Sequence, residues 1–172
     1  KINLSNQGVF DEAAVFGKGS TPMIVERQGL RMALAVGHDL FVSDLMEYYA
    51  ENGADMVICI AALRPEQIDG FLKVAQSTAI RFSIPIMFCN MTGPDCGKEL
   101  GGRSAYIDQN GEIVENCTAG SDVREIRIDV EALNSNTASR VIPPKMQFDG
   151  LDRVDIKKVD ADPNGPFCPF SG

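Results

Sequence analysis

The sequence predicts an α/β fold, in which buried strands alternate with amphipathic helices. Short apolar runs bounded by turn residues, at 31–36, 55–61 and 86–90, are typical of strands that are buried on both faces. Between these runs, the segments 43–52 and 65–82 place apolar residues at the spacing of one helix face. A chain of 172 residues with this alternation is predicted to form one domain with a sizeable core.

The first two strands are predicted to form a hairpin. Residues 1–21 contain several glycines and are expected to be loop-like. A strand is expected from Thr21 to Glu26, and the dipeptide Gln28-Gly29 then forms a tight turn into the apolar strand at 31–36.

This second strand ends abruptly at Gly37-His38-Asp39, and a helix is predicted from about 43 to 52, with Ser43 as its N-cap and Asp44 in its first turn. A residue at such an elbow lies at the carboxyl end of a strand, beside exposed backbone N–H groups. Enzymes place nucleophiles and oxyanion donors at turns of this kind. Here the elbow carries glycine in place of serine, cysteine or threonine.

The following segments continue the alternation. Pro65 begins a helix that is predicted to run to about Phe82, because proline favours the first helical position. Pro85 precedes the strand at 86–90. Residues 91–102 are rich in glycine, proline and polar side chains, which predicts a loop.

The last third of the chain is predicted to hold a hairpin, a strand and a short helix. Asn110-Gly111 is a strong turn signal between strands at 105–108 and 112–116. Residues 123–130 alternate apolar and charged side chains, as a half-exposed strand does. A short helix at about 130–134 is expected to close the compact part, and scattered prolines predict an extended tail over 134–172.

Several short motifs, taken together, resemble those of the carbon–nitrogen hydrolases of the nitrilase superfamily. Their order and spacing carry the resemblance, which covers about residues 1–133. The motifs are Lys1-Ile-Asn-Leu4, Phe10-Asp11-Glu12 with Phe16 and Gly19, Val36-Gly37-His38-Asp39, Asn90, and Gly102-x-Ser104-x-x-Ile107 with Gly111.

The resemblance implies the α-β-β-α sandwich of that family, in which two sheets face each other between layers of helices. Because the lysine motif falls on residue 1, the sequence corresponds to the back part of the domain, and the front half is expected upstream. Residues 1–133 are therefore predicted to be a partial hydrolase domain. The hairpin at 105–116 and the strand at 123–130 are expected to supply part of the second sheet.

The resemblance also implies a Glu–Lys–Cys type of site that transfers an acyl group to a thiolate and then hydrolyses the thioester. Lys1 corresponds to the lysine that stabilises the oxyanion, and His38 to the residue whose backbone N–H assists it. Glu12 and Asp44 correspond to supporting carboxylates. The base glutamate of the family lies upstream of this sequence. Gly37 stands at the position of the catalytic cysteine, so the nucleophile is absent here.

Structural alternatives stay open for each of these residues. Lys1 is otherwise a solvated lysine at the end of the sequence, Glu12 a solvated loop residue, and Asp44 a partner of the helix dipole. His38 is otherwise a structural histidine rather than a base or nucleophile. Gly37 marks either a natural pseudoenzyme or an engineered substitution.

The composition excludes several classes of partner. A net charge of −8 argues against nucleic acid and anionic membranes. The five cysteines are scattered, and Cys59 and Cys89 lie in apolar strands, which predicts buried thiols in a cytoplasmic, reducing compartment. With one histidine and no Cys/His cluster, neither a structural metal nor another cofactor is predicted.

Two functions follow from the sequence. The first is hydrolysis of a carbon–nitrogen bond in a small-molecule amide or nitrile, with Leu63-Arg64 and residues 91–102 as candidate pocket walls. The second is a non-catalytic binding or assembly module. Because strands 32–36 and 55–61 are apolar on both faces, we also expect a homo-oligomer or a complex with a complementary chain.

Overall fold

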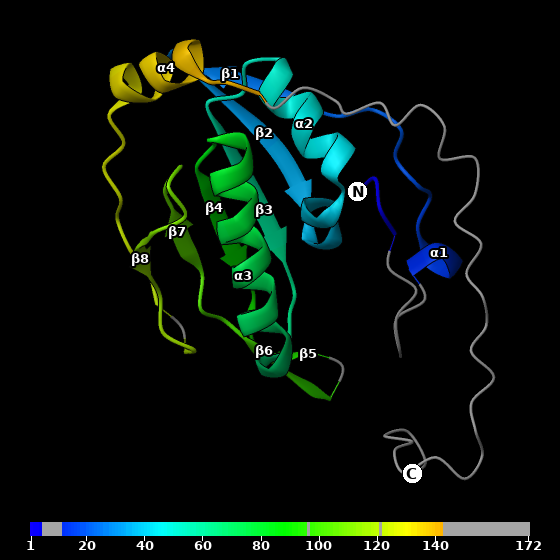
Figure 1. The fold of residues 1–172 in the computed structure, drawn as a ribbon. Helices are drawn as coiled ribbons and strands as arrows, with labels where there is room; N and C mark the ends of the chain where they lie inside the picture. Colours follow the sequence, from blue (N-terminus) through cyan, green and yellow to red (C-terminus); the bar gives the residue numbers. More distant parts are fainter. Residues whose placement is uncertain (5–11, 96, 121, 143–172) are drawn as a thin grey trace, which may run out of the picture. The chain divides into compact units, whose positions relative to one another are not determined.

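The structure is a computed structural model, and it contains a six-stranded mixed sheet with helices, which confirms the predicted α/β class (Figure 1). It describes residues 1–4, 12–95, 97–120 and 122–142. The predicted tail is therefore described only as far as residue 142, and residues 143–172 lie outside the described part.

Three parallel strands form the centre of the sheet, and antiparallel strands flank them on both sides. The strand order is β1-β2-β3-β4-β7-β8. The bounds are β1 (Ile24–Arg27), β2 (Leu30–Val36), β3 (Met56–Ala61), β4 (Ile86–Asn90), β7 (Ala105–Ile107) and β8 (Ile113–Asn116). The turn between β1 and β2 places Gln28 and Gly29 at φ 52° and 77°, as a two-residue hairpin turn requires.

Two helices, α2 (Ser43–Glu51) and α3 (Pro65–Phe82), pack on one face of the sheet (Figure 1). Their apolar faces meet the small side chains of β2 and the larger ones of β4. Phe71 of α3 stacks on Phe88 of β4 with ring centroids 4.8 Å apart, which stabilises the layer by about 1 kcal/mol beyond the buried area. The hydroxyl of buried Tyr49 donates to the Leu34 carbonyl at 2.6 Å, so its polar end is satisfied.

The second sheet expected from residues 105–116 and 123–130 is not formed by them. The hairpin β7–β8 joins the main sheet beside β4, and residues 123–130 form no strand in the described part. Alternation along 123–130 reports half-burial only, because a strand also needs a neighbouring ladder. Val123 is 92% exposed, whereas Ile126 and Ile128 are half-buried.

Two further segments differ from the sequence predictions. The loop expected at 91–102 contains a small separate hairpin, β5 (Thr92–Asp95) with β6 (Lys98–Gly101), turned at Gly97. The loop expected at 1–21 contains a short helix, α1 (Glu12–Val15). Both elements have only four residues per helix or strand. Segments this short are too small to show an apolar periodicity, so the sequence pattern does not predict them.

The last helix, α4 (Val130–Ser139), is longer than the short helix that the sequence predicted. The hydroxyl of Thr137 donates to the buried carboxylate of Asp55 at 2.7 Å. The Arg140 guanidinium donates to carbonyl oxygens at the C-terminal ends of α2 and α3. These bonds attach α4 to the amino end of the sheet, so the extended segment does not begin at residue 134.

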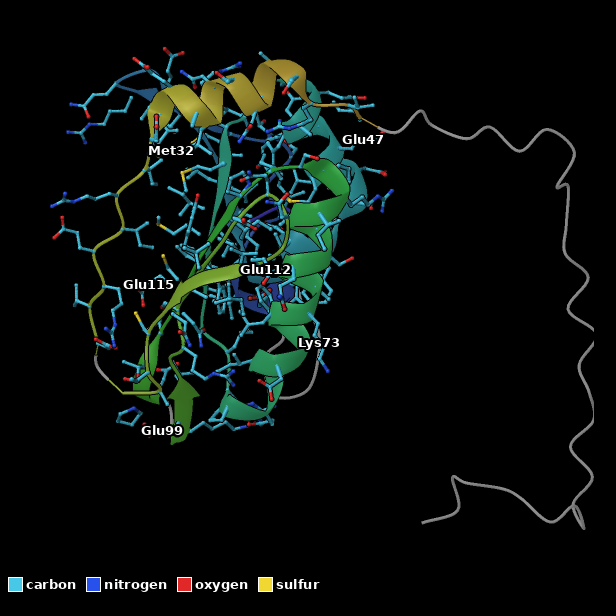
Figure 2. The ribbon with its side chains drawn as sticks, turned by 60° about the vertical axis from the view of Figure 1, so that its left-hand side comes forward. Met32, Glu47, Lys73, Glu99, Glu112 and Glu115 are labelled. Carbon is cyan, nitrogen blue, oxygen red and sulfur yellow. The ribbon has the colours of Figure 1, made fainter. Side chains whose placement is uncertain are left out.

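The sheet face opposite α2 and α3 is apolar and partly exposed. Leu34 of β2 and Ile60 of β3 are 38% and 53% exposed, although both lie in the middle strands. In Figure 2, Met32, near the start of β2, lies close to α4. No second sheet of the size of the first covers this face within residues 1–142 as described.

Candidate functional site

The candidate site lies where β2 ends and the chain turns through a short 3₁₀ helix, η1 (Gly37–Phe41). Figure 1 shows the N-terminus beside this end of β2. The carboxylate of Asp39 is 2% exposed and accepts hydrogen bonds from the backbone N–H groups of Val36, Ile2 and Asn3, at 3.1, 3.0 and 2.5 Å. One buried side chain therefore joins the start of the sequence to the elbow.

Lys1 points at the elbow. Its Nζ lies 3.8 Å from the position that a Cβ atom would take on Gly37. The same ammonium pairs with the carboxylate of Glu12 at 2.5 Å, and the two side chains are 15% and 24% exposed. Lys1, Glu12 and Gly37 are thus brought together, and Lys1 is a paired, largely covered lysine rather than a solvated one.

Gly37 has room for a side chain but a backbone that favours glycine. Its φ is +53°, in the left-handed region, where an L side chain costs about 1 kcal/mol. Apart from the Lys1 ammonium, no described heavy atom outside the adjacent residues lies within 4 Å of the Cβ position. The elbow therefore offers an open position beside a cation, with no thiol or hydroxyl on it.

The side chains of His38 and Asp44 do not join Lys1 in this cluster, and the role of the His38 backbone N–H stays a prediction. The His38 ring lies beside Phe41 with centroids 5.3 Å apart, and its carbonyl accepts from the Asn3 side chain at 3.2 Å. Asp44 is exposed in the first turn of α2, where its charge favours the helix dipole. The helix begins at Ser43, but its N-cap is Val42, and the Ser43 hydroxyl instead accepts from Arg81.

A buried thiol lies beneath the elbow. The Sγ atom of Cys59 donates to the Gly37 carbonyl at 3.8 Å, and its side chain is fully buried. Burial raises the pKa of Cys59 to about 12, so it stays a thiol and is a poor nucleophile. The pKa of half-buried Cys89 is also raised, first by burial and then by nearby Cys117. A raised pKa makes each of these two thiols a poor nucleophile at neutral pH.

Asn90, at the carboxyl end of β4, connects the neighbouring loops. Its Oδ1 accepts from the Leu63 N–H at 2.7 Å, and its Nδ2 donates to the Gly102 carbonyl at 2.8 Å. Its backbone N–H donates to the Ser104 hydroxyl at 3.0 Å. The two family-like motifs at Asn90 and 102–104 are therefore one network, and it joins the segments that the sequence suggested as pocket walls.

A separate surface groove of about 500 Å³ runs between α3 and the β7–β8 turn and is lined by residues that include Lys73, Arg81 and Glu112. Figure 2 shows Lys73 on α3 and Glu112 beside the hairpin. These side chains form an open, charged groove rather than part of the Lys1 cluster.

Other types of site are not found among the described residues. Within these ranges no group of three His, Cys, Asp or Glu side chains is placed to hold a metal ion. In the same ranges, no helix is long and apolar enough to cross a membrane. Cys59, Cys89 and Cys117 are free thiols. A cytoplasmic location stays a prediction.

Asp39 has no role in the sequence predictions beyond its place in the elbow motif. Its partners Ile2 and Asn3 lie 37 and 36 residues away in the chain, and no local pattern reports such contacts. One local signal exists, because an acidic residue three positions after Val36 is placed to accept its N–H across the first turn of η1.

Known proteins resemble this chain in sequence. The sequence model of the family "Carbon-nitrogen hydrolase" matches residues 1–135. A 2-oxoglutaramate amidase from Paenarthrobacter nicotinovorans is 26% identical over 132 residues, which cover 74% of this chain and 45% of the amidase. A glutamine-dependent NAD(+) synthetase from Aquifex aeolicus is 26% identical over 174 residues, covering 95% of this chain and 30% of the synthetase.

Solved structures share the fold. A mutant of the amidase from Nesterenkonia sp. AN1 in complex with butyramide has a TM-score of 0.64 at 21% identity, covering 70% of this chain and 45% of the amidase. The glutamine-dependent NAD+ synthetase from Acinetobacter baumannii also has a TM-score of 0.64, at 23% identity, covering 69% of this chain and 23% of the synthetase. The chain spans about half, or less, of the length of these relatives. Because the family model matches residues 1–135, most of its length, the chain belongs to the carbon–nitrogen hydrolase family.

Proposed function

We propose that this chain carries the lysine and the elbow of an amide- or nitrile-hydrolysing site, and that Gly37 makes it a site that binds such a group without cleaving it. The observation that carries the proposal is the 3.8 Å between Lys1 Nζ and the Cβ position of Gly37. At this distance an ammonium can stabilise negative charge on a group placed at the elbow.

Physical chemistry supports a binding role for Lys1. An ammonium that is largely covered stabilises negative charge on a ligand oxygen or nitrogen better than a solvated one does. Hydrolysis by the family's route needs a thiolate at the elbow. Gly37 supplies none, and buried Cys59, with a pKa of about 12, does not supply one either.

The names of the relatives suggest a carboxamide as ligand. Glutamine and 2-oxoglutaramate are both five-carbon acids that end in a primary amide, and each appears in the name of a relative. Both amides are therefore candidate ligands of the Lys1 site.

Ammonia release tests the hydrolytic part of the proposal. The chain, incubated with glutamine, 2-oxoglutaramate or butyramide, should release no ammonia above the buffer rate. The Gly37→Cys variant should also stay inactive on its own, because the family's route also needs a base glutamate, and the resemblance assigns none among these 172 residues. Ammonia release that survives blocking of the thiols would overturn the assignment.

Calorimetric titration with the same amides tests the binding part. The unchanged chain should bind at least one of them, and Lys1→Met should weaken that binding about tenfold, because a charge-assisted hydrogen bond is lost. A matched control is Lys73→Met, since Lys73 lies on α3 in the separate groove. Equal affinities for both variants would contradict the role of Lys1.

We also propose that a partner covers the apolar sheet face, as a second copy or a complementary chain. Leu34 and Ile60 are more exposed than apolar residues of central strands usually are. Sedimentation at micromolar concentration should show a dimer or a larger species. A stable, well-folded monomer would contradict this proposal.

A further inference from the structure

We infer that Asp39 is the positioning residue that holds Lys1 against the elbow; the inference rests on the proposed function of that site. Asp39 does not reach the open position on Gly37 itself. It acts through the backbone of the lysine segment, which is residues 1–3.

The Asp39 carboxylate binds both parts that must be brought together. Two of its donors, the N–H groups of Ile2 and Asn3, belong to the segment that follows Lys1. The third donor, the N–H of Val36, belongs to the last residue of β2. A carboxylate accepts several hydrogen bonds at once, whereas an amide side chain offers one oxygen and would turn its NH₂ group toward the other donors.

The peptide unit that joins Lys1 to Ile2 is held on both sides. Its N–H, from Ile2, donates to Asp39 at 3.0 Å, and its carbonyl, from Lys1, accepts from the Gly19 N–H at 2.8 Å. A Cβ atom on Gly19 would lie 2.9 Å from the Lys1 carbonyl oxygen, so this approach requires glycine. Because a peptide unit is planar, fixing both ends fixes the position of the Lys1 Cα atom, from which the side chain starts.

Two further bonds complete the arrangement. The Asn3 side chain donates to the His38 carbonyl at 3.2 Å, which adds a second link between the lysine segment and the elbow. Glu12 pairs with the Lys1 ammonium and holds its far end. Asp39 sets where the side chain starts, and Glu12 sets where the charge lies.

The position of Lys1 has a measurable consequence for a thiol at the elbow. In a Gly37→Cys variant, an ammonium about 4 Å from the new side chain should lower the pKa of the introduced thiol by about one pH unit or more from its ordinary value near 8.5. Asp39, as a nearby negative charge, should by itself raise that pKa. Removing the Asp39 charge therefore lowers the pKa if the effect is purely electrostatic, and raises it if Lys1 loses its position.

The experiment measures the alkylation rate of the introduced thiol with iodoacetamide as a function of pH, resolved by mass spectrometry from the native cysteines. The variants are Gly37→Cys alone and combined with Lys1→Met or with Asp39→Asn. We expect the pKa to rise by about one pH unit in both combinations. Gly70→Cys, an exposed helical position with no described contact within 4 Å, is the matched control, and its pKa should not respond to either change.

The outcomes separate this inference from the proposed function. If the introduced thiol has an ordinary pKa that Lys1→Met does not change, the proposed function of the Lys1 site fails. If Lys1→Met raises the pKa while Asp39→Asn lowers it or leaves it unchanged, the proposed function stands and the positioning role of Asp39 is wrong.

A measurement on the unchanged chain covers the case in which Asp39→Asn does not fold. The amide protons of Ile2 and Asn3 should exchange with solvent at least about tenfold more slowly than their intrinsic rates, because both are bonded to a buried carboxylate. Exchange of these two amides at the intrinsic rates would overturn the inference.

Discussion

The carboxyl ends of β2 and β4 lie at the same edge of the sheet, because the two strands run parallel through β3. The end of β2 is built from charged groups, with Asp39 buried and Lys1 paired to Glu12. The end of β4 is built from neutral groups, with Asn90 bonded to Leu63, Gly102 and Ser104.

The two strand ends differ in whether a polar side chain faces an open position. At β4, each described bond of Asn90 goes to a loop backbone or to a neighbouring hydroxyl, so the network only fastens loops. At β2, the carboxylate of Asp39 fastens the backbone, and the ammonium of Lys1 is left facing an open position on Gly37. The open position beside a charge leaves room for a ligand, whereas the bonded Asn90 network holds loops in place.

The largest expected effect comes from removing the charged centre. Asp39→Ala leaves the buried N–H groups without their acceptor and should lower the free energy of unfolding by about 3 kcal/mol. Asp44→Ala is the matched control, because this exposed acid only favours the helix dipole, and it should cost about 0.5 kcal/mol. Urea unfolding of both variants measures the two losses of stability. Equal losses would contradict the prediction that the buried Asp39 stabilises the fold more than the exposed Asp44.

Removing the Asn90 side chain, at the end of β4, should lower the free energy of unfolding somewhat less than removing that of Asp39. Asn90→Ala deletes the side-chain bonds to Leu63 and Gly102 and should lower the free energy of unfolding by about 2 kcal/mol. It should not change the pKa of a thiol introduced at Gly37, since its network holds no charge. Asn116→Ala, in the edge strand β8, is the control and should lie within about 0.5 kcal/mol of the unchanged chain.

The buried thiol of Cys59, beneath the elbow, should make the free energy of unfolding fall at alkaline pH. The pKa of Cys59 is raised by burial from 9.0 to about 12, so the folded state keeps the proton that the unfolded state loses. Its contribution is fully present below pH 9 and is lost between pH 9 and 12, with a slope approaching about 1.4 kcal/mol per pH unit. Cys59→Ser should flatten this fall in urea unfolding, and parallel profiles would contradict the prediction.

The smallest effect concerns the open position itself. Gly37→Ala places a side chain at a φ of +53° and should cost about 1 kcal/mol, although the space is free. Gly70→Ala, within α3 and with no described contact at its Cβ position, should instead stabilise the fold by about 0.5–1 kcal/mol. The two thermal unfolding midpoints should therefore shift in opposite directions, and a shift of both in the same direction would contradict the backbone argument.

Local patterns in the sequence are enough to predict the class of the fold, the family and most of the central elements. The strand at 86–90 and the helix at 65–82 have the predicted bounds in the structure, because apolar periodicity and flanking prolines are local signals. The resemblance also selects Lys1, Glu12 and Gly37, which the structure brings together. Asp44 is selected in the same way, yet it is exposed on α2, away from that cluster.

Which distant segments meet becomes visible only in the folded chain. The hairpin 105–116 lies in the main sheet rather than in a second one, residues 123–130 have no strand partner in the described part, and α4 is extended by its attachment to Asp55. The role of Asp39 also depends on folding, since its hydrogen-bond donors Ile2 and Asn3 lie 37 and 36 residues away in the chain. A periodic pattern indicates only whether a side chain is buried. Which element packs against it depends on contacts with residues far away in the chain, and the local sequence does not encode those contacts.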